Sequence, residues 1–214
     1  IYTLPFLTFL IIVMTIKKEN PKRSKFNNIG LSVSTSYLLL TLILKWVSFQ
    51  KFEEGLQNQQ IEYVEMDIKP SPLNAILWSS LIETDKGFRT AYYSLFDKQE
   101  ITYSKVFLKN HHLLEPYLEQ KVIKQLIDIS AGWYRIEEKN GKLLFWDLRF
   151  GQMGMDVNTA SFLWYYELNI DSNGRVSAKK TQPKITNFKK LFLSLFSRIK
   201  GCLLYTSPSP RDTN

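Results

Sequence analysis

Two apolar stretches open the chain, and a basic segment separates them. Residues 1–16 carry no charged side chain, and residues 29–46 are again apolar apart from Lys45 near their end. A helix of 16 residues is about 24 Å long, shorter than the roughly 30 Å hydrocarbon core of a bilayer. Because the chain starts apolar and without Met, we expect residues 1–47 to be a transmembrane hairpin from a larger helical membrane domain.

The second apolar stretch carries small and hydroxyl-bearing residues on one helix face. Gly30, Ser34, Tyr37 and Thr41 follow one another at spacings that place them on the same side of a helix. Such residues let helix backbones approach closely in lipid, where the burial of Leu offers little. We therefore expect this face to meet other membrane helices of the same protein, including helices upstream of residue 1.

Beyond a linker expected over residues 48–60, the hydrophobic period becomes two. Val64, Met66 and Ile68 alternate with polar residues, as on a half-buried strand. Aromatic residues concentrate in this part of the chain, and large rings pack well on a pleated surface. The further strands that we predict cover residues 74–83, 88–95, 101–107, 133–138, 142–150, 162–170 and 175–178.

Turn and helix signals organise these strands. Asp85-Lys86-Gly87 and Asn140-Gly141 predict two tight hairpins. One long helix is predicted between the two hairpins, with Pro116 in its first turns and Gly132 as its stop. Its apolar stripe consists of Leu114, Leu118, Val122, Leu126 and Ile129. About eight strands and one long helix indicate an antiparallel α+β soluble domain over residues 61–178.

Residues 179–200 form a basic amphipathic segment in which Ile185–Ile199 is predicted to be a helix. Its apolar side consists of Phe188, Leu191, Phe192, Leu195, Phe196 and Ile199. At about 22 Å this helix is too short to cross a bilayer. The pattern favours a helix on an anionic membrane surface, with Arg198 among its cations. The alternative is a helix that packs on the domain's own sheet.

Charge is distributed unevenly along the chain. The net charge of +8 comes from residues 17–25, which carry +4, and residues 179–200, which carry +7, so residues 26–178 carry −3. A nucleic-acid surface needs Lys and Arg on the folded domain. We therefore expect no nucleic-acid partner, and we expect the lipid bilayer to attract the basic ends. Short basic loops stay cytoplasmic, so residues after about 50 are expected outside the cytoplasm.

The two histidines, His111 and His112, are adjacent. Metal ligands on one face are two residues apart on a strand, or three to four apart on a helix, so neighbouring histidines rarely bind one ion. The pair also lies where a helix is predicted to start. We expect it to be a polar helix start, and we predict no metal-binding residue in this chain.

Asp147 and Arg149 are the best candidates for a polar site. Two residues apart on a predicted strand, they project from the same face with roughly 6–7 Å between them. They could together hold a small polar ligand. Flanked by Phe145 and Trp146, they could equally form a partly buried structural ion pair, which is the interpretation that we favour.

No catalytic residue is predicted from the remaining motifs. Ser79-Ser80 lies within a strand and lacks the flanking glycines of a nucleophile elbow. Gly151 and Gly154 form no phosphate-binding loop, because no GxxxxGK pattern follows. The residues alone therefore indicate architecture and location rather than chemistry.

Two stretches, Pro70–Asp97 and Leu113–Gly151, carry a resemblance to a known family. Their shared features are Pro-x-Asn-x-x-x-Trp at Pro72–Trp78, a Tyr-Tyr-Ser strand, an amphipathic helix ending in an aromatic residue, and Asp-Leu-Arg-Phe-Gly. With the preceding helices, residues 1–178 resemble the C-terminal region of bacterial membrane-bound proteins described as metal-dependent hydrolases. That family includes inner-membrane members regulated by the SOS repressor.

The resemblance implies a multi-pass protein of the bacterial inner membrane and a divalent metal cofactor in the full-length protein. The family's His and Asp motifs lie in its N-terminal half, and none matches a position in this chain. We therefore expect the chain to be the C-terminal part of such a hydrolase, without a cofactor and inactive alone. The alternative is a non-enzymatic membrane-anchored domain that binds a lipid, an envelope polymer or a protein partner.

The last residues, 201–214, are expected to be a disordered or artefactual tail. Residues 202–212 resemble the translated read-through of a sequencing adapter, and we expect the native chain to have been cut off near Gly201. The single cysteine, Cys202, lies in this stretch, so an intramolecular disulfide is excluded.

Overall fold

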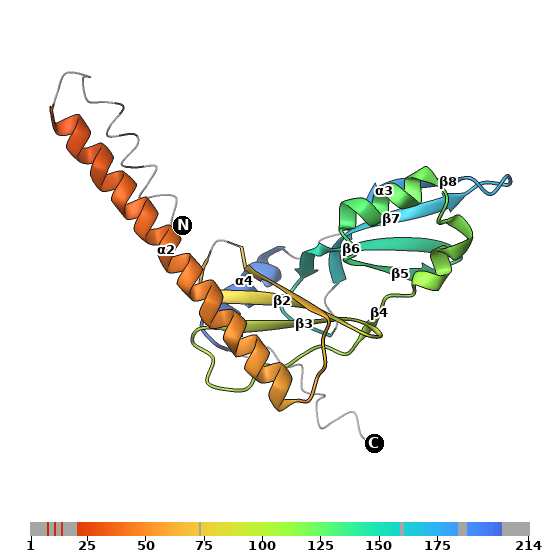
Figure 1. Cartoon of the computed structure of the whole chain (residues 1–214), viewed down its shortest axis with the longest axis horizontal. Coiled ribbons are helices and arrows are strands. Elements are labelled where there is room, and N and C mark those ends of the chain that lie inside the picture. The colour runs from red at the N-terminus through yellow and green to blue at the C-terminus, as the bar shows by residue number, and fades with distance from the viewer. Residues whose placement is uncertain are drawn as a thin grey trace.

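One long helix and two antiparallel sheets dominate the structure (Figure 1). The computed structural model describes residues 21–72, 74–158, 161–183 and 188–202, together with Thr8, Ile11 and Met14. The predicted α+β class is confirmed, with eight strands in these ranges. Each sheet has four strands in sequential order, so neighbours along the chain are also neighbours in the sheet.

Helix α2 (Pro21–Asn58) is continuous through the end of the predicted basic loop, the second apolar stretch and the predicted linker. The basic loop was expected to reach Lys25, but Pro21 already begins the helix, a position that tolerates proline. Residues 48–58, which we expected to form a linker, are instead the last turns of α2. Phe52 and Leu56 lie one turn apart and are fully buried, and this tertiary packing stabilises the helix beyond the apolar stretch.

One helix among the described residues, Arg23–Asn58, is long and apolar enough to cross a membrane, by length and composition. Two spans were predicted, but the first, residues 1–16, lies outside the described residues except for the three named above. On α2 the predicted packing face is the less exposed one. Gly30 is buried and Thr41 half-buried, whereas Leu38 and Leu42 are exposed.

Sheet 1 consists of β1 (Glu65–Pro70), β2 (Leu77–Thr84), β3 (Gly87–Ser94) and β4 (Phe107–Leu108). The predicted hairpin between β2 and β3 is confirmed, with Thr84 opposite Gly87. Gly87 is required there, because an added Cβ would lie 2.2 Å from the carbonyl oxygen of Phe107. The predicted strand over 101–107 shrinks to β4 and one isolated bridge between Tyr103 and Ala91.

Sheet 2 consists of β5 (Tyr134–Lys139), β6 (Lys142–Met153), β7 (Ser161–Ile170) and β8 (Val176–Thr181). The Asn140-Gly141 hairpin is confirmed, and both residues adopt positive φ, 52° and 70°, as a type I′ turn requires.

The predicted long helix before β5 is two elements. A 3₁₀ helix, η1 (His111–Tyr117), contains Pro116, and α3 (Lys121–Ser130) follows after Gln120 in an extended conformation. Proline lacks the N–H that a continuous α-helix would need at this point. The apolar stripe still packs on sheet 2, where Leu114, Ile123 and Leu126 are buried.

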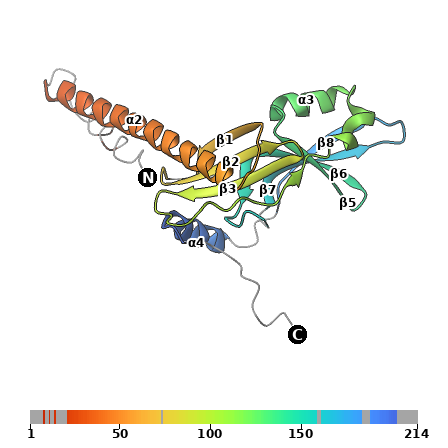
Figure 2. The same ribbon diagram turned by 60° about the horizontal axis from the view of Figure 1, so that its bottom comes forward.

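Both faces of sheet 1 are covered, which sets it apart as the centre of the molecule. Alternate residues such as Trp78 and Ile82 pack against α2. The opposite face contacts sheet 2 through Leu81 and Phe88, and it also contacts α4 (Phe188–Ile199) through Leu77 and Tyr92. Figure 2 shows α2 and α4 on opposite sides of this sheet.

Candidate ligand pocket between the two sheets

A pocket of about 200 Å³ lies where the face of sheet 1 that is turned away from α2 meets the end of β6. Sheet 1 lines it with Asp67, Lys69, Ser79, Leu81, Thr90 and Tyr92. Residues 148–152 of β6 line the other side, together with Phe162 of β7 and the Pro70–Pro72 segment. The pocket therefore combines charged, hydroxyl and aromatic groups from two separate sheets.

A large bulge in β6 places the residues on its sheet 2 side. Asp147 pairs with Trp164 and Gln152 pairs with Phe162, so residues 148–151 lie opposite Leu163 alone. Gly151 adopts φ of 76°, a left-handed conformation that glycine tolerates without strain. Bulges of this kind re-aim side chains out of a regular sheet and are frequent beside functional sites.

Asp147 and Arg149 form a bidentate ion pair at the base of this bulge. The guanidinium donates from Nε to Oδ1 over 3.0 Å and from Nη2 to Oδ2 over 2.7 Å. Asp147 is buried, whereas Arg149 keeps 28% of its side chain exposed and lines the pocket. Hydrogen bonding to Asp147 raises the pKa of Arg149 further. Two of its five N–H groups are used in this pair, which leaves three donors.

Lys69 approaches Arg149 from sheet 1. Its Nζ lies 2.6 Å from Oδ2 of Asp67 and donates to the carbonyl oxygen of Arg149 over 3.2 Å. Each cation in the pocket thus has its own carboxylate partner, so the four charged groups sum to zero. A site balanced in this way suits an uncharged polar ligand better than a free anion or cation.

Hydroxyl and amide groups continue the polar lining. Ser79 donates to the carbonyl oxygen of Lys69 over 3.2 Å, and Thr90 donates to Oε1 of Gln152 over 2.9 Å across the two sheets. Tyr92 donates to the carbonyl oxygen of Gly154 over 3.2 Å, and burial raises the pKa of its hydroxyl. These oxygens retain lone pairs that can accept a further hydrogen bond.

An exposed aromatic ring, Phe150, forms the rim. Its side chain is 53% exposed, and it meets Trp164 edge to face with ring centroids 5.9 Å apart. The guanidinium of Arg149 lies 5.6 Å from the centre of the Phe150 ring. A large exposed ring beside polar groups is the usual surface for stacking a flat apolar face of a polar ligand.

The two segments that carry the family resemblance meet at this pocket. In the first, Oδ1 of Asn74 accepts hydrogen bonds from the backbone N–H groups of Ile76 and Leu77, and Trp78 is buried. These contacts turn the chain from the Pro70–Pro72 segment into β2. The second, Asp147–Gly151, is the bulge itself. Residues about 80 positions apart in the sequence thus contribute to one site.

The histidines have a different setting. The hydroxyl of Tyr134 hydrogen-bonds Nδ1 of His111, and His112 is exposed on η1. The described residues contain no group of three or more His, Cys, Asp or Glu side chains arranged to hold a metal ion. Whether this chain binds a metal stays a prediction.

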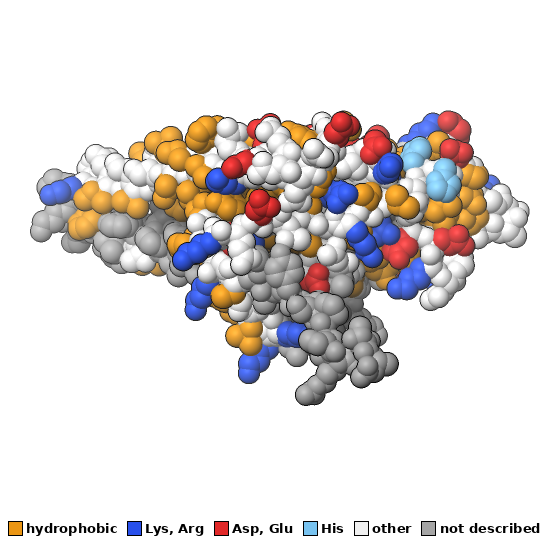
Figure 3. All heavy atoms as spheres, turned by 90° about the horizontal axis from the view of Figure 1, so that it is seen from below, with side chains coloured by type: hydrophobic (Ala, Val, Ile, Leu, Met, Phe, Trp, Pro, Cys, Tyr) orange, Lys and Arg blue, Asp and Glu red, His pale blue; other side chains and the backbone are white. Residues whose placement is uncertain are grey.

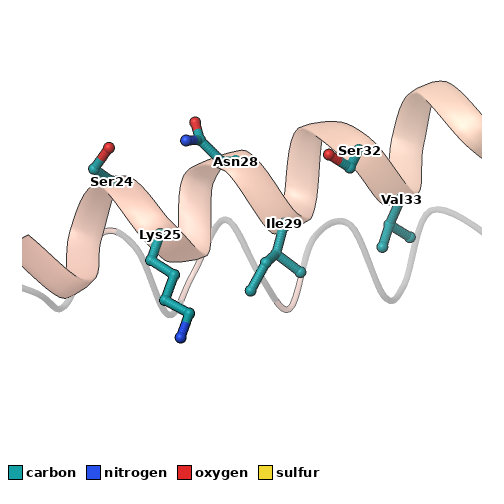
Figure 4. Close-up of a pocket in the computed structure, with 6 residues that line it drawn as sticks. All are labelled: Ser24, Lys25, Asn28, Ile29, Ser32 and Val33. Atoms are coloured by element: carbon teal, nitrogen blue, oxygen red, sulfur yellow. The ribbon is translucent and has the colours of Figure 1, made fainter.

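A second hollow of about 550 Å³ runs along the N-terminal part of α2 (Figure 4). The side chains of Ser24, Asn28 and Ser32 point to one side of the helix, and those of Lys25 and Val33 point to the other. Its described lining, with Ile29, comes entirely from α2, so it brings together no residues that are distant in sequence.

Sequence reasoning found Asp147 and Arg149 but missed their neighbours in the pocket. Lys69 and Thr90 have no local signature, because they are single polar residues on regularly paired strands, and Gln152 reaches the pocket only through the bulge that precedes it. The glycine at 151, inside a strand pattern, was the available signal for the bulge. No protein-family model, curated protein or solved structure matches the chain.

Proposed function

We propose that the chain is the membrane-anchored, ligand-binding part of a larger bacterial membrane protein. Helix α2 crosses the inner membrane, and the pocket between the two sheets binds a polyhydroxylated ligand such as a sugar unit of an envelope polymer. The observation that carries this proposal is the convergence of Pro70–Pro72 and residues 148–152 on one polar pocket.

The chemistry of the lining supports a sugar-like ligand. The charges of Lys69 and Arg149 are compensated by carboxylates, while donors on Arg149 and hydroxyl acceptors on Ser79 and Thr90 remain. The ring of Phe150 offers a stacking surface for the C–H face of a sugar. A free phosphate would meet two cations that carboxylates already neutralise.

The binding test uses the full chain in detergent micelles and an oligomer of N-acetylglucosamine, titrated by calorimetry. We expect saturable binding that weakens at least tenfold in Phe150→Ala and in Arg149→Lys, which keeps the charge but loses the guanidinium fork. Lys142→Ala, on the Asn140-Gly141 hairpin outside the pocket, is the matched control. Equal affinity in all four proteins, or binding of inorganic phosphate alone, would contradict the proposed ligand class.

The resemblance suggests a role for this domain within a metal-dependent hydrolase. The divalent metal would be held by residues outside this chain, and the pocket would position substrate beside it. For the chain alone we expect no stoichiometric zinc or manganese and no hydrolysis. One tight metal equivalent that disappears in His111→Ala with His112→Ala would overturn that expectation.

The alternative is a non-enzymatic anchored domain that only binds the polymer, lipid or partner. Extending the reading frame upstream of Ile1 separates the two. Clusters of His and Asp beside further membrane helices would support the hydrolase, and a plain signal-anchor would support the binding domain.

The side of the membrane is tested with Cys202, the single cysteine of the chain. Cys202 is free and exposed, so a membrane-impermeant maleimide should label it in intact cells if the domain lies outside the cytoplasm. Cys202→Ser supplies the background. Labelling only after cell lysis would place the domain in the cytoplasm.

A further inference from the structure

Helix α4 is attached to the domain along one side and at one end. Leu195 and Arg198 are buried, and the hydroxyl of Ser94 donates to the carbonyl oxygen of Ile199 over 2.7 Å. Gly201 follows close to Phe96, whose carbonyl oxygen would lie 2.8 Å from an added Cβ. These contacts hold the C-terminal end of α4 against the turn that follows β3.

The other side of α4 carries an exposed aromatic row. Phe188, Phe192 and Phe196 are 68%, 41% and 39% exposed, and neighbouring rings pack together with centroids 6.1 Å and 4.8 Å apart. Leu193 beside them is 58% exposed. The row is therefore ordered within the helix, yet the described residues of the domain leave much of its surface open.

Positive charge accompanies this apolar surface. Lys189, Lys190 and Lys200 are exposed, and residues 188–200 contain no acidic residue. Figure 3 shows basic and hydrophobic side chains side by side where α4 projects from the domain. Arg198 was predicted to be one of these cations, but it does not belong to this set, because its guanidinium donates to both carboxylate oxygens of Asp97.

We propose that the aromatic row of α4 inserts into the headgroup layer of the anionic bilayer that α2 crosses. Aromatic rings flanked by lysines, without acids, match the chemistry of an interfacial helix. The inference rests on the membrane-spanning role proposed for α2, and it is independent of the pocket. Since α2 and α4 cover opposite faces of sheet 1, two membrane contacts would fix the orientation of the domain.

The test places a spin label on the full chain in bilayers. In a Cys202→Ser background, Leu193→Cys reports on α4, Leu40→Cys on α2, and Leu108→Cys on β4 as a water-exposed reference; all three native leucines are about half exposed. Accessibility to oxygen, which concentrates in lipid, is compared with accessibility to a water-soluble nickel chelate. The bilayers contain phosphatidylcholine with or without phosphatidylglycerol.

We expect the label at 193 to favour oxygen in the anionic bilayer. Neutral lipid, or Lys189→Glu with Lys190→Glu, should return it to the accessibility of the label at 108. A label at 193 that stays in water while the label at 40 lies in lipid would overturn the inference and leave the anchor intact. A label at 193 shielded from both reagents would also overturn it, in favour of a protein partner. A label at 40 in water would contradict the membrane span itself.

Discussion

Helices α2 and α4 cover opposite faces of the same sheet, but different forces hold them. The docked turns of α2 bury Phe52 and Leu56 completely, and the side chains of Tyr103 and Tyr63 add hydrogen bonds to Phe52 and Glu53. Helix α4 buries a single large apolar side chain, Leu195. A bidentate ion pair between Arg198 and Asp97 fixes it instead.

The two kinds of contact have different consequences, one for the stability of the fold and the other for the position of the helix. Apolar burial is nondirectional. The contact of α2 therefore stabilises the fold without requiring one exact position of the helix on the sheet. A buried ion pair contributes little net stability, because desolvation offsets much of the attraction, but it demands one geometry. We therefore infer that α2 makes the larger contribution to folding and that Arg198 and Asp97 decide where α4 lies.

The largest effect is expected from breaking the ion pair on one side. Arg198→Met leaves Asp97 buried without its partner, which should cost about 3–5 kcal/mol in the free energy of unfolding. Urea unfolding of the full chain in detergent measures it. Lys142→Met removes a half-exposed pair with Glu167 and should cost below about 1 kcal/mol. Equal costs would show that the Arg198 pair is not effectively buried.

Truncation of a buried side chain of α2 should have the next largest effect on the free energy of unfolding. Leu56→Ala leaves a cavity against sheet 1 and should cost about 2–5 kcal/mol in the same assay. Leu39→Ala on the exposed side of α2 is the matched control, and it should change little. If Leu56→Ala were also neutral, the last turns of α2 would not be part of the core.

Removing the hydroxyl of Tyr103 tests how much a single hydrogen bond contributes to the docking of α2. This hydroxyl donates to the carbonyl oxygen of Phe52 over 2.6 Å, and Tyr103→Phe should cost about 1 kcal/mol. Tyr117→Phe is the control, because that hydroxyl has no hydrogen-bond partner among the described residues. A loss as large as that of Leu56→Ala would mean that polar contacts dominate on this side too.

The smallest effect concerns alkaline pH. Burial raises the pKa of Tyr92 and Tyr103 above the ordinary value, so both stay neutral in the folded state after they would ionise in the unfolded chain. The neutral tyrosines make their full contribution to the free energy of unfolding below pH 10. As the pH rises above 10, that free energy falls by roughly 0.8 kcal/mol per tyrosine at pH 10.5. Urea midpoints measured from pH 8 to 10.5 should fall less steeply in Tyr92→Phe and Tyr103→Phe. Identical slopes would contradict the assignment.

Most of the strand pattern could be predicted because it depends on local chemistry. The Asn140-Gly141 turn and the alternation of Val64, Met66 and Ile68 require only backbone preference and period. The helix before β5 was placed correctly but not divided, because its apolar stripe keeps helical spacing on both sides of Pro116. The N–H that Pro116 lacks and the packing of η1 and α3 on sheet 2 together account for the break.

Only part of the pocket could be predicted from the sequence. Asp147 and Arg149 are two residues apart on a strand, so their proximity is a local property. Lys69 lies about 80 residues away, and nothing around it distinguishes it from other strand lysines. Its contact with the bulge depends on the way in which the two sheets pack.

Local sequence patterns were sufficient to predict the apolar helix, the antiparallel strands, their hairpins and the basic amphipathic helix near the C-terminal end. Each depends on neighbours a few residues apart, where periodicity and turn chemistry act. The tertiary structure alone decided that α2 continues to Asn58, that Arg198 turns inward to Asp97, and that two distant segments share a pocket. Those outcomes depend on burial between elements far apart in the chain, which no local pattern encodes.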